Sequence, residues 1–253
     1  MAILFSGDFH ANAVNELSRI TKKALNAKYG PALFSEIRYH VILGDGGFMW
    51  PGNEKGDAYN YKTLAYRPFP ILCVIGNHEP MLGKTDLPEL DIGIGENVFP
   101  VHEKPFVAYL KRGKVYTIDG FDFLVLGGAL SIDKKFRKPG LSWWEGEYWS
   151  FDEKKALMDL LKGRNRFDYV LSHTGPARIN HLLFQNGGDA YFPKFFDDVA
   201  ALNETIEERI TCKGWFCGHW HKDKYYYDET LKREYRYLYN STAILKENEI
   251  IAE

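Results

Sequence analysis

Cysteine is scarce in this chain of 253 residues, which contains only Cys73, Cys212 and Cys217. Three cysteines in apolar surroundings cannot build a disulfide framework, and Cys212 and Cys217 lack the second pair that a zinc-binding motif needs. We therefore expect all three to be buried thiols that serve packing.

An excess of charge of either sign is also missing. The 32 lysines and arginines against 34 aspartates and glutamates give a net charge of -2, so no global positive field attracts nucleic acid or acidic lipid. Nucleic acid is therefore not a favoured partner, and any polyanion must be bound by a local group of residues.

Long hydrophobic runs are absent as well. No segment approaches the roughly 18 apolar residues that span a bilayer, and residues 1–8 lack the basic segment that opens a signal peptide. These features predict a cytoplasmic protein without a membrane partner.

What remains is the composition of an ordinary globular protein, with 45% apolar, 15% aromatic and 26% charged residues. That composition excludes disordered, collagen-like and coiled-coil chains. The length is compatible with one or two domains, and we expect residues 1–253 to form a single one.

Short apolar runs alternate with longer helical patterns, which predicts an α/β protein. Residues 2–6, 39–43 and 70–75 predict strands with both faces covered by helices. Residues 12–28 have helical spacing, and the Gly30-Pro31 pair that follows predicts the end of that helix. Residues 80–114 are rich in glycine, proline and charge and predict a long surface excursion.

The second half of the chain continues the alternation. A hairpin is expected to turn at Asp119-Gly120, and the capping box of Ser150 and Glu153 predicts a helix that ends at Gly163. The expected segments are hairpins over 115–126 and 224–239, helices over 150–163 and 194–210, and strands over 168–172 and 213–217. This order predicts two sheets packed together between helical layers.

Small polar clusters follow the expected strands. The clusters are Asp8-Phe9-His10, Gly44-Asp45, Gly76-Asn77-His78-Glu79, His173 and Gly218-His219-Trp220-His221. They contain five of the eight histidines, and loops at strand ends are where α/β folds place their sites. Imidazole, carboxylate and amide oxygen together form a ligand set for manganese, iron, zinc or nickel. The sequence therefore predicts a transition-metal site.

The spacing within the clusters supports one shared site. Side chains two positions apart on an extended segment point to the same side, so Asp8 with His10, and His219 with His221, can converge. The preceding glycines are expected to permit close approach of the backbone. The candidate ligands are Asp8, His10, Asp45, Asn77, His173, His219 and His221. Seven ligands are too many for one tetrahedral ion, whereas two ions that share a bridging carboxylate would use them all.

The series D-x-H, G-D, G-N-H-E, H and G-H-x-H, from Asp8 to His221, resembles the calcineurin-like metallophosphoesterase superfamily. The resemblance implies a four-layer α/β/β/α sandwich of two mixed sheets flanked by helices, with a dinuclear metal site at the strand ends. It implies one ion on Asp8, His10 and His221. The second ion would be held by Asn77, His173 and His219, with Asp45 as the bridge. His78 matches the family's histidine that reaches the substrate phosphate without binding metal.

We therefore expect a dinuclear metal-dependent phosphoesterase with Asp45 and His78 as catalytic residues. A metal-bridging hydroxide would attack a phosphate mono- or diester. Manganese is the expected ion, although iron, zinc and nickel accept the same ligands. The substrate would be a nucleotide, a small metabolite or a phosphoprotein.

One departure from the family's motifs narrows this expectation. The protein serine/threonine phosphatase branch continues its second motif as G-D-x-x-D-R-G, whereas this chain reads G-D-G-G-F-M-W from Gly44 to Trp50. The missing aspartate and arginine argue against that branch and favour a bacterial or phage-type enzyme. Two alternatives stay open, namely a DNA or RNA nuclease of the same superfamily and a non-catalytic metal-binding scaffold.

Several residues near the expected site have two interpretations. Arg137 and Lys134, in a basic cluster over 134–138, would bind the substrate phosphate or form a solvated loop. The aromatic segment 143–149 would stack a base or pack as a lid, and packing is favoured. Arg178 would face the substrate or begin a surface helix, and the surface helix is favoured.

For a further group of residues we expect supporting roles. Glu79 would accept a hydrogen bond that orients a histidine ligand. Trp220 would point away from its neighbouring histidines into the core. His40, His102 and His181 are expected to be structural rather than ligands.

Overall fold

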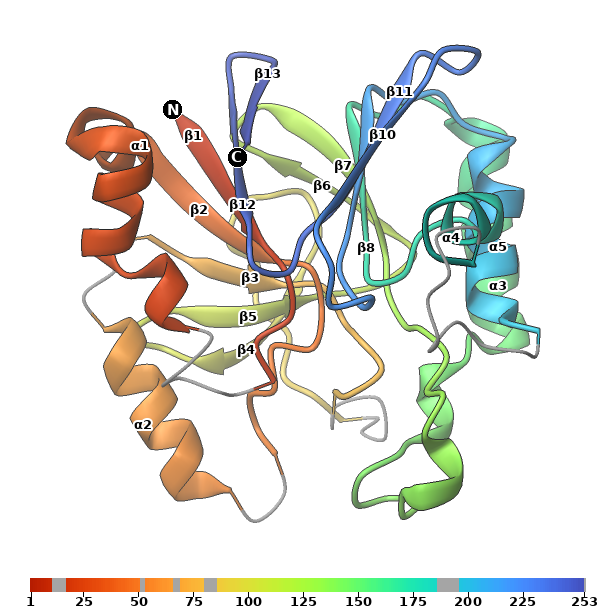
Figure 1. The fold of residues 1–253 in the computed structure, drawn as a ribbon. Helices are drawn as coiled ribbons and strands as arrows, with labels where there is room; N and C mark the ends of the chain where they lie inside the picture. The colour runs from red at the N-terminus through yellow and green to blue at the C-terminus, as the bar shows by residue number, and fades with distance from the viewer. Residues whose placement is uncertain (11–16, 51–52, 66–68, 80–85, 186–195, 253) are drawn as a thin grey trace.

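Two β-sheets face each other between two layers of helices in the computed structural model of the chain (Figure 1). The structure describes residues 1–10, 17–50, 53–65, 69–79, 86–185 and 196–252. Both sheets are mixed, with parallel and antiparallel neighbours. The expected four-layer α/β/β/α architecture is confirmed.

The first sheet contains both ends of the described chain. Its strands are β1 (Ala2–Ser6), β2 (Ile37–Ile42), β3 (Ile71–Cys73), β4 (Val98–His102), β5 (Val107–Leu110), β12 (Thr242–Lys246) and β13 (Glu249–Ala252). Their order across the sheet is β13-β12-β1-β2-β3-β5-β4. The parallel strands β1, β2 and β3 are therefore direct neighbours near the centre of the sheet.

The second sheet is built from the later part of the chain. Its strands are β6 (Lys114–Ile118), β7 (Phe121–Leu126), β8 (Tyr169–Ser172), β9 (Gly214–Cys217), β10 (Lys224–Asp228) and β11 (Arg233–Tyr237). Their order is β10-β11-β9-β8-β7-β6, and β8 and β9 are parallel neighbours at its centre.

The helices cover the outer faces of the two sheets (Figure 1). They are α1 (Lys22–Glu36) and α2 (Glu54–Leu64) on the first sheet, and α3 (Phe151–Gly163), α4 (Ala177–Asn180) and α5 (Asp198–Glu207) on the second. Among the described residues, no helix is both long enough and apolar enough to cross a bilayer.

Alternation of side chains along the strands explains the layers. Ile3 and Phe5 of β1 point toward the second sheet, where the Phe5 ring stacks on Phe216 with centroids 4.3 Å apart. Leu4 points to the opposite side and packs with Leu25 of α1. Because each strand is apolar on both faces, it can sit between a helix layer and another sheet.

The expected stop of the first helical segment at Gly30-Pro31 is confirmed as a break, although a second helical segment follows it directly. Gly30 does leave the helical conformation, with φ 81° and ψ 157°, but helical turns resume and α1 runs on to Glu36. Proline suits the first turn of a helical segment, and Phe34 in the resumed part is buried against Phe69. The proposed start over 12–16 lies outside the described residues.

The expected surface excursion over 80–114 is wrong in its second half. β4 and β5 form an antiparallel pair, and β5 lies parallel to β3, so this segment completes one edge of the first sheet. All four residues of β5 are buried. Residues 80–85 lie outside the description.

The other expected elements are present with small shifts. The hairpin turns at Asp119 and Gly120, both with positive φ (52° and 85°), and Ser150 and Glu153 form the capping box of α3. The helix expected over 194–210 is shorter, since α5 spans Asp198–Glu207. The three cysteines are buried and free. Besides β4 and β5, the sequence had not predicted α2, β12 and β13.

Candidate metal centre

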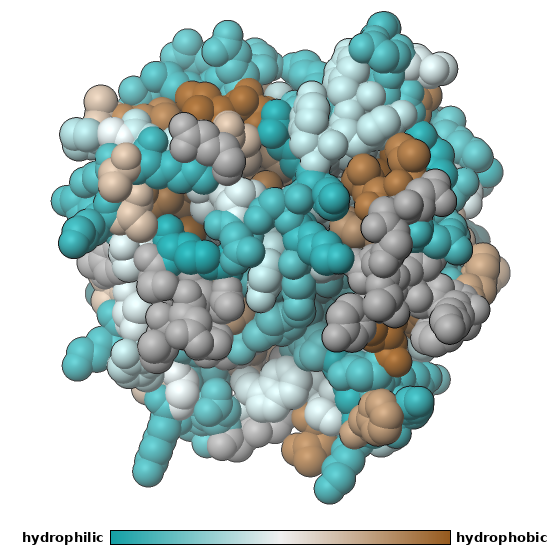
Figure 2. Space-filling model, viewed as in Figure 1, coloured by the Kyte–Doolittle hydropathy of each residue, from teal (hydrophilic) through white to brown (hydrophobic). Residues whose placement is uncertain are grey.

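Five loops at the carboxyl ends of parallel strands bring the predicted ligands together. The loops after β1, β2 and β3 carry Asp8 with His10, Asp45, and Asn77 with His78, and those after β8 and β9 carry His173, and His219 with His221. Parallel neighbours end at the same edge of a sheet, so each sheet contributes its ligands to one place. The space-filling view of this side is hydrophilic over its centre (Figure 2).

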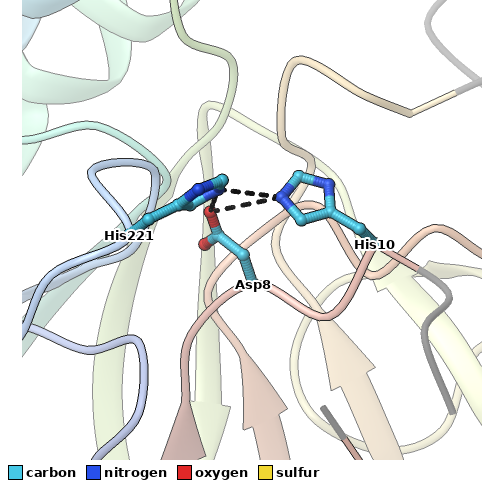
Figure 3. Close-up of side chains that lie close together, drawn as sticks. All are labelled: Asp8, His10 and His221. Atoms are coloured by element: carbon cyan, nitrogen blue, oxygen red, sulfur yellow. Dashed lines mark hydrogen bonds and ion pairs between the residues drawn. The ribbon is translucent and has the colours of Figure 1, made fainter. Parts of the chain in front are cut away.

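Asp8, His10 and His221 form the first group of converging ligand atoms (Figure 3). The Nε2 atoms of the two imidazoles lie 2.9 Å apart. Oδ2 of Asp8 lies 3.2 Å from Nε2 of His221 and 3.9 Å from Nε2 of His10. Two imidazoles and a carboxylate at these separations suit a divalent transition-metal ion.

His173, Asn77 and Asp45 form a second group. Nε2 of His173 lies 3.0 Å from Oδ1 of Asn77 and 3.3 Å from Oδ2 of Asp45. Its other nitrogen, Nδ1, lies 2.8 Å from the carbonyl oxygen of Leu43. A bond from Nδ1–H to that carbonyl fixes the ring so that Nε2 faces the carboxylate and the amide, as in many metal-binding histidines.

Asp45 lies between the two groups. Besides its contact with His173, its Oδ2 lies 3.8 Å from Nδ1 of His10. Its Oδ1 accepts a hydrogen bond of 2.8 Å from the backbone N–H of His78. One carboxylate therefore contacts both groups of predicted ligands.

His219 lies beside the second group but is less closely integrated with it. Its ring centroid is 5.0 Å from that of His173, and it belongs to none of the compact groups of carboxylate and imidazole atoms found among the described residues. Its backbone N–H donates to both oxygens of Asp8, at 3.0 and 3.1 Å. The loop after β9 thus holds the carboxylate of Asp8 in place.

The pKa values of these groups indicate a site made for a cation. Burial alone would raise the pKa of Asp8 and Asp45, but nearby imidazoles, His173 above all, lower both, and that of Asp45 falls well below its usual range. Burial would lower the pKa of His173, yet Asp45 and Asp8 raise it to about 10. A proton on His173 therefore supplies the positive charge that a metal ion would supply to the same carboxylates.

Three glycines leave room for ligands that come from other loops. A Cβ on Gly44 would lie 2.2 Å from Nδ1 of His173, and a Cβ on Gly218 would lie 2.3 Å from Oδ1 of Asp8. A Cβ on Gly76 would lie 2.1 Å from Oδ1 of Asp45. The expected close approach of the backbone is confirmed.

The backbone itself is strained where it carries ligands. His10, Asp45, His219 and His221 all have positive φ, between 47° and 69°. For residues other than glycine this conformation costs roughly 1 kcal/mol or more each. Such strain is concentrated at functional sites, because the surrounding structure must hold the side chains in a set direction.

A cavity of about 530 Å³ opens over the predicted ligands. Its lining includes the polar residues Asp45, His78 and Arg137 and the apolar residues Leu130, Ile132 and Trp220. The guanidinium of Arg137 donates to Nε2 of His78, and its Nε donates to Asp133 at 2.7 Å. Burial lowers the pKa of His78 to about 4, and the charges of Arg137 and His10 act in the same direction, against that of Asp45. His78 is therefore neutral near pH 7 and accepts from Arg137.

Lys134 lies farther from the ligands. Its ammonium sits over the Trp143 ring, 3.9 Å from the centroid, and it lines a neighbouring cavity instead of the one over the ligands. Trp144 and Trp149 are 6% and 4% exposed, which bears out packing for much of the aromatic segment.

The remaining residues mostly have supporting roles. His40 is fully buried and bonded to Ser6 Oγ at 2.7 Å. Arg178 pairs with Glu207 and Asp228 rather than facing the ligands. Trp220 stacks on Phe184 with centroids 4.3 Å apart, and it also lines the cavity.

The expected role of Glu79 needs correction. Its Oε1 accepts from the backbone N–H of Gly46 at 2.7 Å, so it supports the loop of Asp45 and does not bond a histidine. Burial raises its pKa well above the usual range, and the charge of Asp45 adds to this effect.

Sequence reasoning overlooked three neighbours of the ligands. Ser131 bonds Asn77, Glu147 bonds Ser131, and the Tyr239 ring stacks on His221. Ser131 follows the apolar strand β7, which is the same signal that identified the ligands. Glu147 and Tyr239 carry no such signal, because they reach the site only through the tertiary fold.

Comparison with known proteins agrees with this geometry. A sequence model of the calcineurin-like phosphoesterase family matches residues 1–223. No curated protein sequence matches the chain. One crystal structure superimposes with a TM-score of 0.60 at 10% identity, over 100% of this chain and 98% of the other.

Two further solved structures align less closely. The phosphopantetheinyl hydrolase PptH of Mycobacterium tuberculosis has a TM-score of 0.45 at 12% identity, over 94% of this chain and 90% of its own. GAP50, the anchor in the inner membrane complex of Plasmodium, has a TM-score of 0.48 at 11% identity, over 100% and 83%.

The family match includes every predicted ligand from Asp8 to His221, as well as His78. The likeness of the first solved structure, at 10% identity, concerns the fold and agrees with the two-sheet architecture. The chain therefore belongs to the calcineurin-like phosphoesterase family.

Proposed function

We propose that this phosphoesterase hydrolyses a phosphate mono- or diester with two divalent transition-metal ions bound at the carboxyl ends of its strands. The observation that carries the proposal is the position of Asp45. Its Oδ2 lies 3.3 Å from a nitrogen of His173, 3.8 Å from one of His10 and 4.0 Å from one of His78. One carboxylate thus touches both groups of ligands and the histidine assigned to the substrate.

The residues present fit such ions. Asp8, His10 and His221 would hold the first, while Asn77, His173 and His219 would hold the second, with Asp45 shared. Two bound cations would supply an activated water and would neutralise negative charge on phosphoryl oxygens. We propose manganese, and iron, zinc and nickel accept the same donors.

Arg137 would then bind the phosphate group of the substrate, and His78 would donate a proton to the leaving oxygen. The guanidinium can bind two phosphate oxygens at once, and Asp133 holds it in a fixed direction at 2.7 Å. A phosphate dianion between them would replace the direct contact of Arg137 with His78. Its negative charge would raise the pKa of His78, which could then give a proton to the leaving oxygen.

The substrate proposal follows from the size and the apolar lining of the same cavity. A volume of about 530 Å³ leaves space for more than a phosphate group, and Leu130, Ile132 and Trp220 provide apolar surface for the rest. A nucleotide, a small metabolite or a phosphoprotein side chain remains the proposed substrate class. We propose a cytoplasmic location, with Arg137 as the main substrate contact and Lys134 as a secondary one.

The proposal is tested on protein stripped of metal and reconstituted with manganese. Hydrolysis rates are measured for bis-p-nitrophenyl phosphate and p-nitrophenyl phosphate, with Asp45→Asn as the inactive control. A higher rate on the diester would direct the search to cyclic nucleotides and nucleic acids, and a higher rate on the monoester to phosphatase substrates. A protein that binds two ions yet cleaves neither ester would instead be the non-catalytic scaffold.

A further inference from the structure

Asn77 presents its two amide ends to two different surroundings. Oδ1 faces Nε2 of His173 at 3.0 Å, on the side of the ligands. Nδ2 faces Oγ of Ser131 at 2.8 Å, on the side of the protein interior. Asn77 is 2% exposed, so water does not decide which end faces which way. Only the oxygen end can bind a cation.

Ser131 is in turn bound by Glu147 through two hydrogen bonds. The backbone N–H of Ser131 donates to Oε1 of Glu147, and its hydroxyl pairs with Oε2, both at 2.6 Å. Ser131 is 3% exposed and Glu147 is completely buried. Both carboxylate oxygens therefore bond Ser131.

The direction of these bonds decides the orientation of the amide. Oε1 of Glu147 must accept, because its partner is a backbone N–H. When Oε2 also accepts, the single hydroxyl proton of Ser131 points to Glu147, and Oγ can only accept from its other neighbour. That neighbour must then be the amide nitrogen of Asn77, which leaves Oδ1 toward the ligands.

Two contacts fix the backbone around Glu147. Nε1 of Trp149 donates to the carbonyl of Gly127 at 2.8 Å. A Cβ on Gly128 would lie 2.7 Å from the carbonyl oxygen of Glu147, so the two backbones touch. These two contacts hold residues 147–149 against residues 127–128, which keeps the backbone of Glu147 close to the loop that carries Ser131.

We propose that Glu147 is a positioning residue that acts through Ser131 to fix the Asn77 amide with its oxygen toward the metal centre. The inference rests on the proposed function, since it assigns Asn77 to one of the two ions. The predicted effect is on metal affinity, which can be measured without any phosphate ester.

Glu147→Gln provides the decisive variant. It keeps the size and shape of the side chain but reverses the direction of its hydrogen bond with the Ser131 hydroxyl. The glutamine oxygen accepts from the backbone N–H of Ser131, and the glutamine NH₂ donates to Oγ. The hydroxyl proton is then free to donate to Asn77, which favours the amide turned with NH₂ toward the ligands. We expect the second ion to bind about 10- to 100-fold more weakly, while the first ion on Asp8, His10 and His221 is retained.

Asn77→Asp supplies the matched rescue. An aspartate has oxygen at both ends, so the direction of the Ser131 hydroxyl no longer decides what faces the ion. We expect Glu147→Gln to weaken the second ion strongly when Asn77 is present and much less when it is combined with Asn77→Asp. Glu145→Gln, an exposed position in the same short turn, is the control that should change nothing.

The experiment is a titration of each metal-free variant with manganese, read by calorimetry and by electron paramagnetic resonance, with thermal unfolding recorded in parallel. Selective loss of the second ion with rescue by Asn77→Asp supports the proposal. Equal weakening of both ions, or the same loss with and without Asn77→Asp, would overturn it. A wild-type protein that binds two ions but hydrolyses no ester would contradict the proposed function and leave this inference standing.

Discussion

The ring of Tyr239 lies face to face with the imidazole of His221, with centroids 4.8 Å apart and planes inclined by 15°. The backbone of Tyr239 is itself fixed, because its N–H donates to Asp223 at 2.8 Å and its carbonyl accepts from Arg19. The tyrosine thus limits the rotation of His221, a proposed metal ligand whose side chain is otherwise exposed.

Replacing this ring should loosen His221. We expect Tyr239→Leu to lower the affinity of the first ion by about tenfold, because the stacking partner that orients the ligand is lost. Tyr239→Phe keeps the ring and should bind manganese as the wild type does. Equal affinities for the leucine and phenylalanine variants would show that the stack plays no part.

Gly76→Ala should disrupt the shared carboxylate. The new Cβ would lie 2.1 Å from Oδ1 of Asp45, and a displacement of about 1 Å at a reacting centre costs on the order of a hundredfold in rate. We expect weaker binding of both ions and a loss of activity of at least that size. Gly163→Ala is the matched control, because nothing lies within 4 Å of its Cβ. Normal metal content in Gly76→Ala would contradict the assignment of Asp45.

Asp45→Asn and His78→Ala should separate metal binding from turnover. Loss of the Asp45 charge should weaken both ions and reduce activity by several orders of magnitude. His78→Ala should leave the metal content near normal and lower kcat, because His78 is assigned to the phosphate. Metal analysis alongside steady-state kinetics distinguishes the two effects, and wild-type activity in Asp45→Asn would rule out the dinuclear assignment.

Arg137 should affect substrate affinity more than metal affinity. Arg137→Ala removes the two-pronged contact with phosphate, and we expect KM to rise by about tenfold or more. Lys134→Ala should have a smaller effect, because the Lys134 ammonium lies over Trp143. The comparison requires KM and manganese affinity for both variants. A larger effect at Lys134 would reverse their proposed order.

Metal binding should release protons at neutral pH. The carboxylates of Asp45 and Asp8 outweigh burial and raise the pKa of His173 to about 10 in the metal-free protein, so Nε2 must lose its proton to become a ligand. The apparent affinity should therefore rise with pH, by about tenfold per unit below that pKa for each proton released. Calorimetry at pH 7 in buffers with different ionisation enthalpies measures the number released. A value of zero would contradict the protonated state of His173.

The proposed metal ligands stand out in the sequence because each one comes within a few residues of the end of an apolar strand. His10 and His221 are far apart in the chain, and only the shared edge of the two sheets brings their nitrogens to 2.9 Å. Each histidine can still be recognised from its own short motif, D-x-H for His10 and G-H-x-H for His221. The Glu147–Ser131 pair could not be predicted in this way, because its contact with Asn77 depends on two loops closing against each other.

Some elements were missed for similar physical reasons. α2 buries Asp57 and Asn60 beside Leu64, so its inward face has no clear apolar periodicity. β4 contains Pro100 and lies at the edge of the sheet, where proline is tolerated although it suggests a loop. In both elements, tertiary contacts determine the secondary structure more strongly than the local sequence pattern does.

The pairing of β1 with β12 also affects how the protein acquires its structure. Ala2 lies opposite Lys246, and Ser6 opposite Thr242, so the strand that leads to Asp8 completes its pairing with residues near the other end of the described chain. Contacts between residues so distant in sequence slow folding, because the intervening chain must first be ordered. During synthesis, one edge of β1 would remain unpaired until residues 242–246 had left the ribosome. A nascent chain with such an open strand edge is prone to association with other chains, so protection by chaperones would matter more for this protein than for one built from local hairpins.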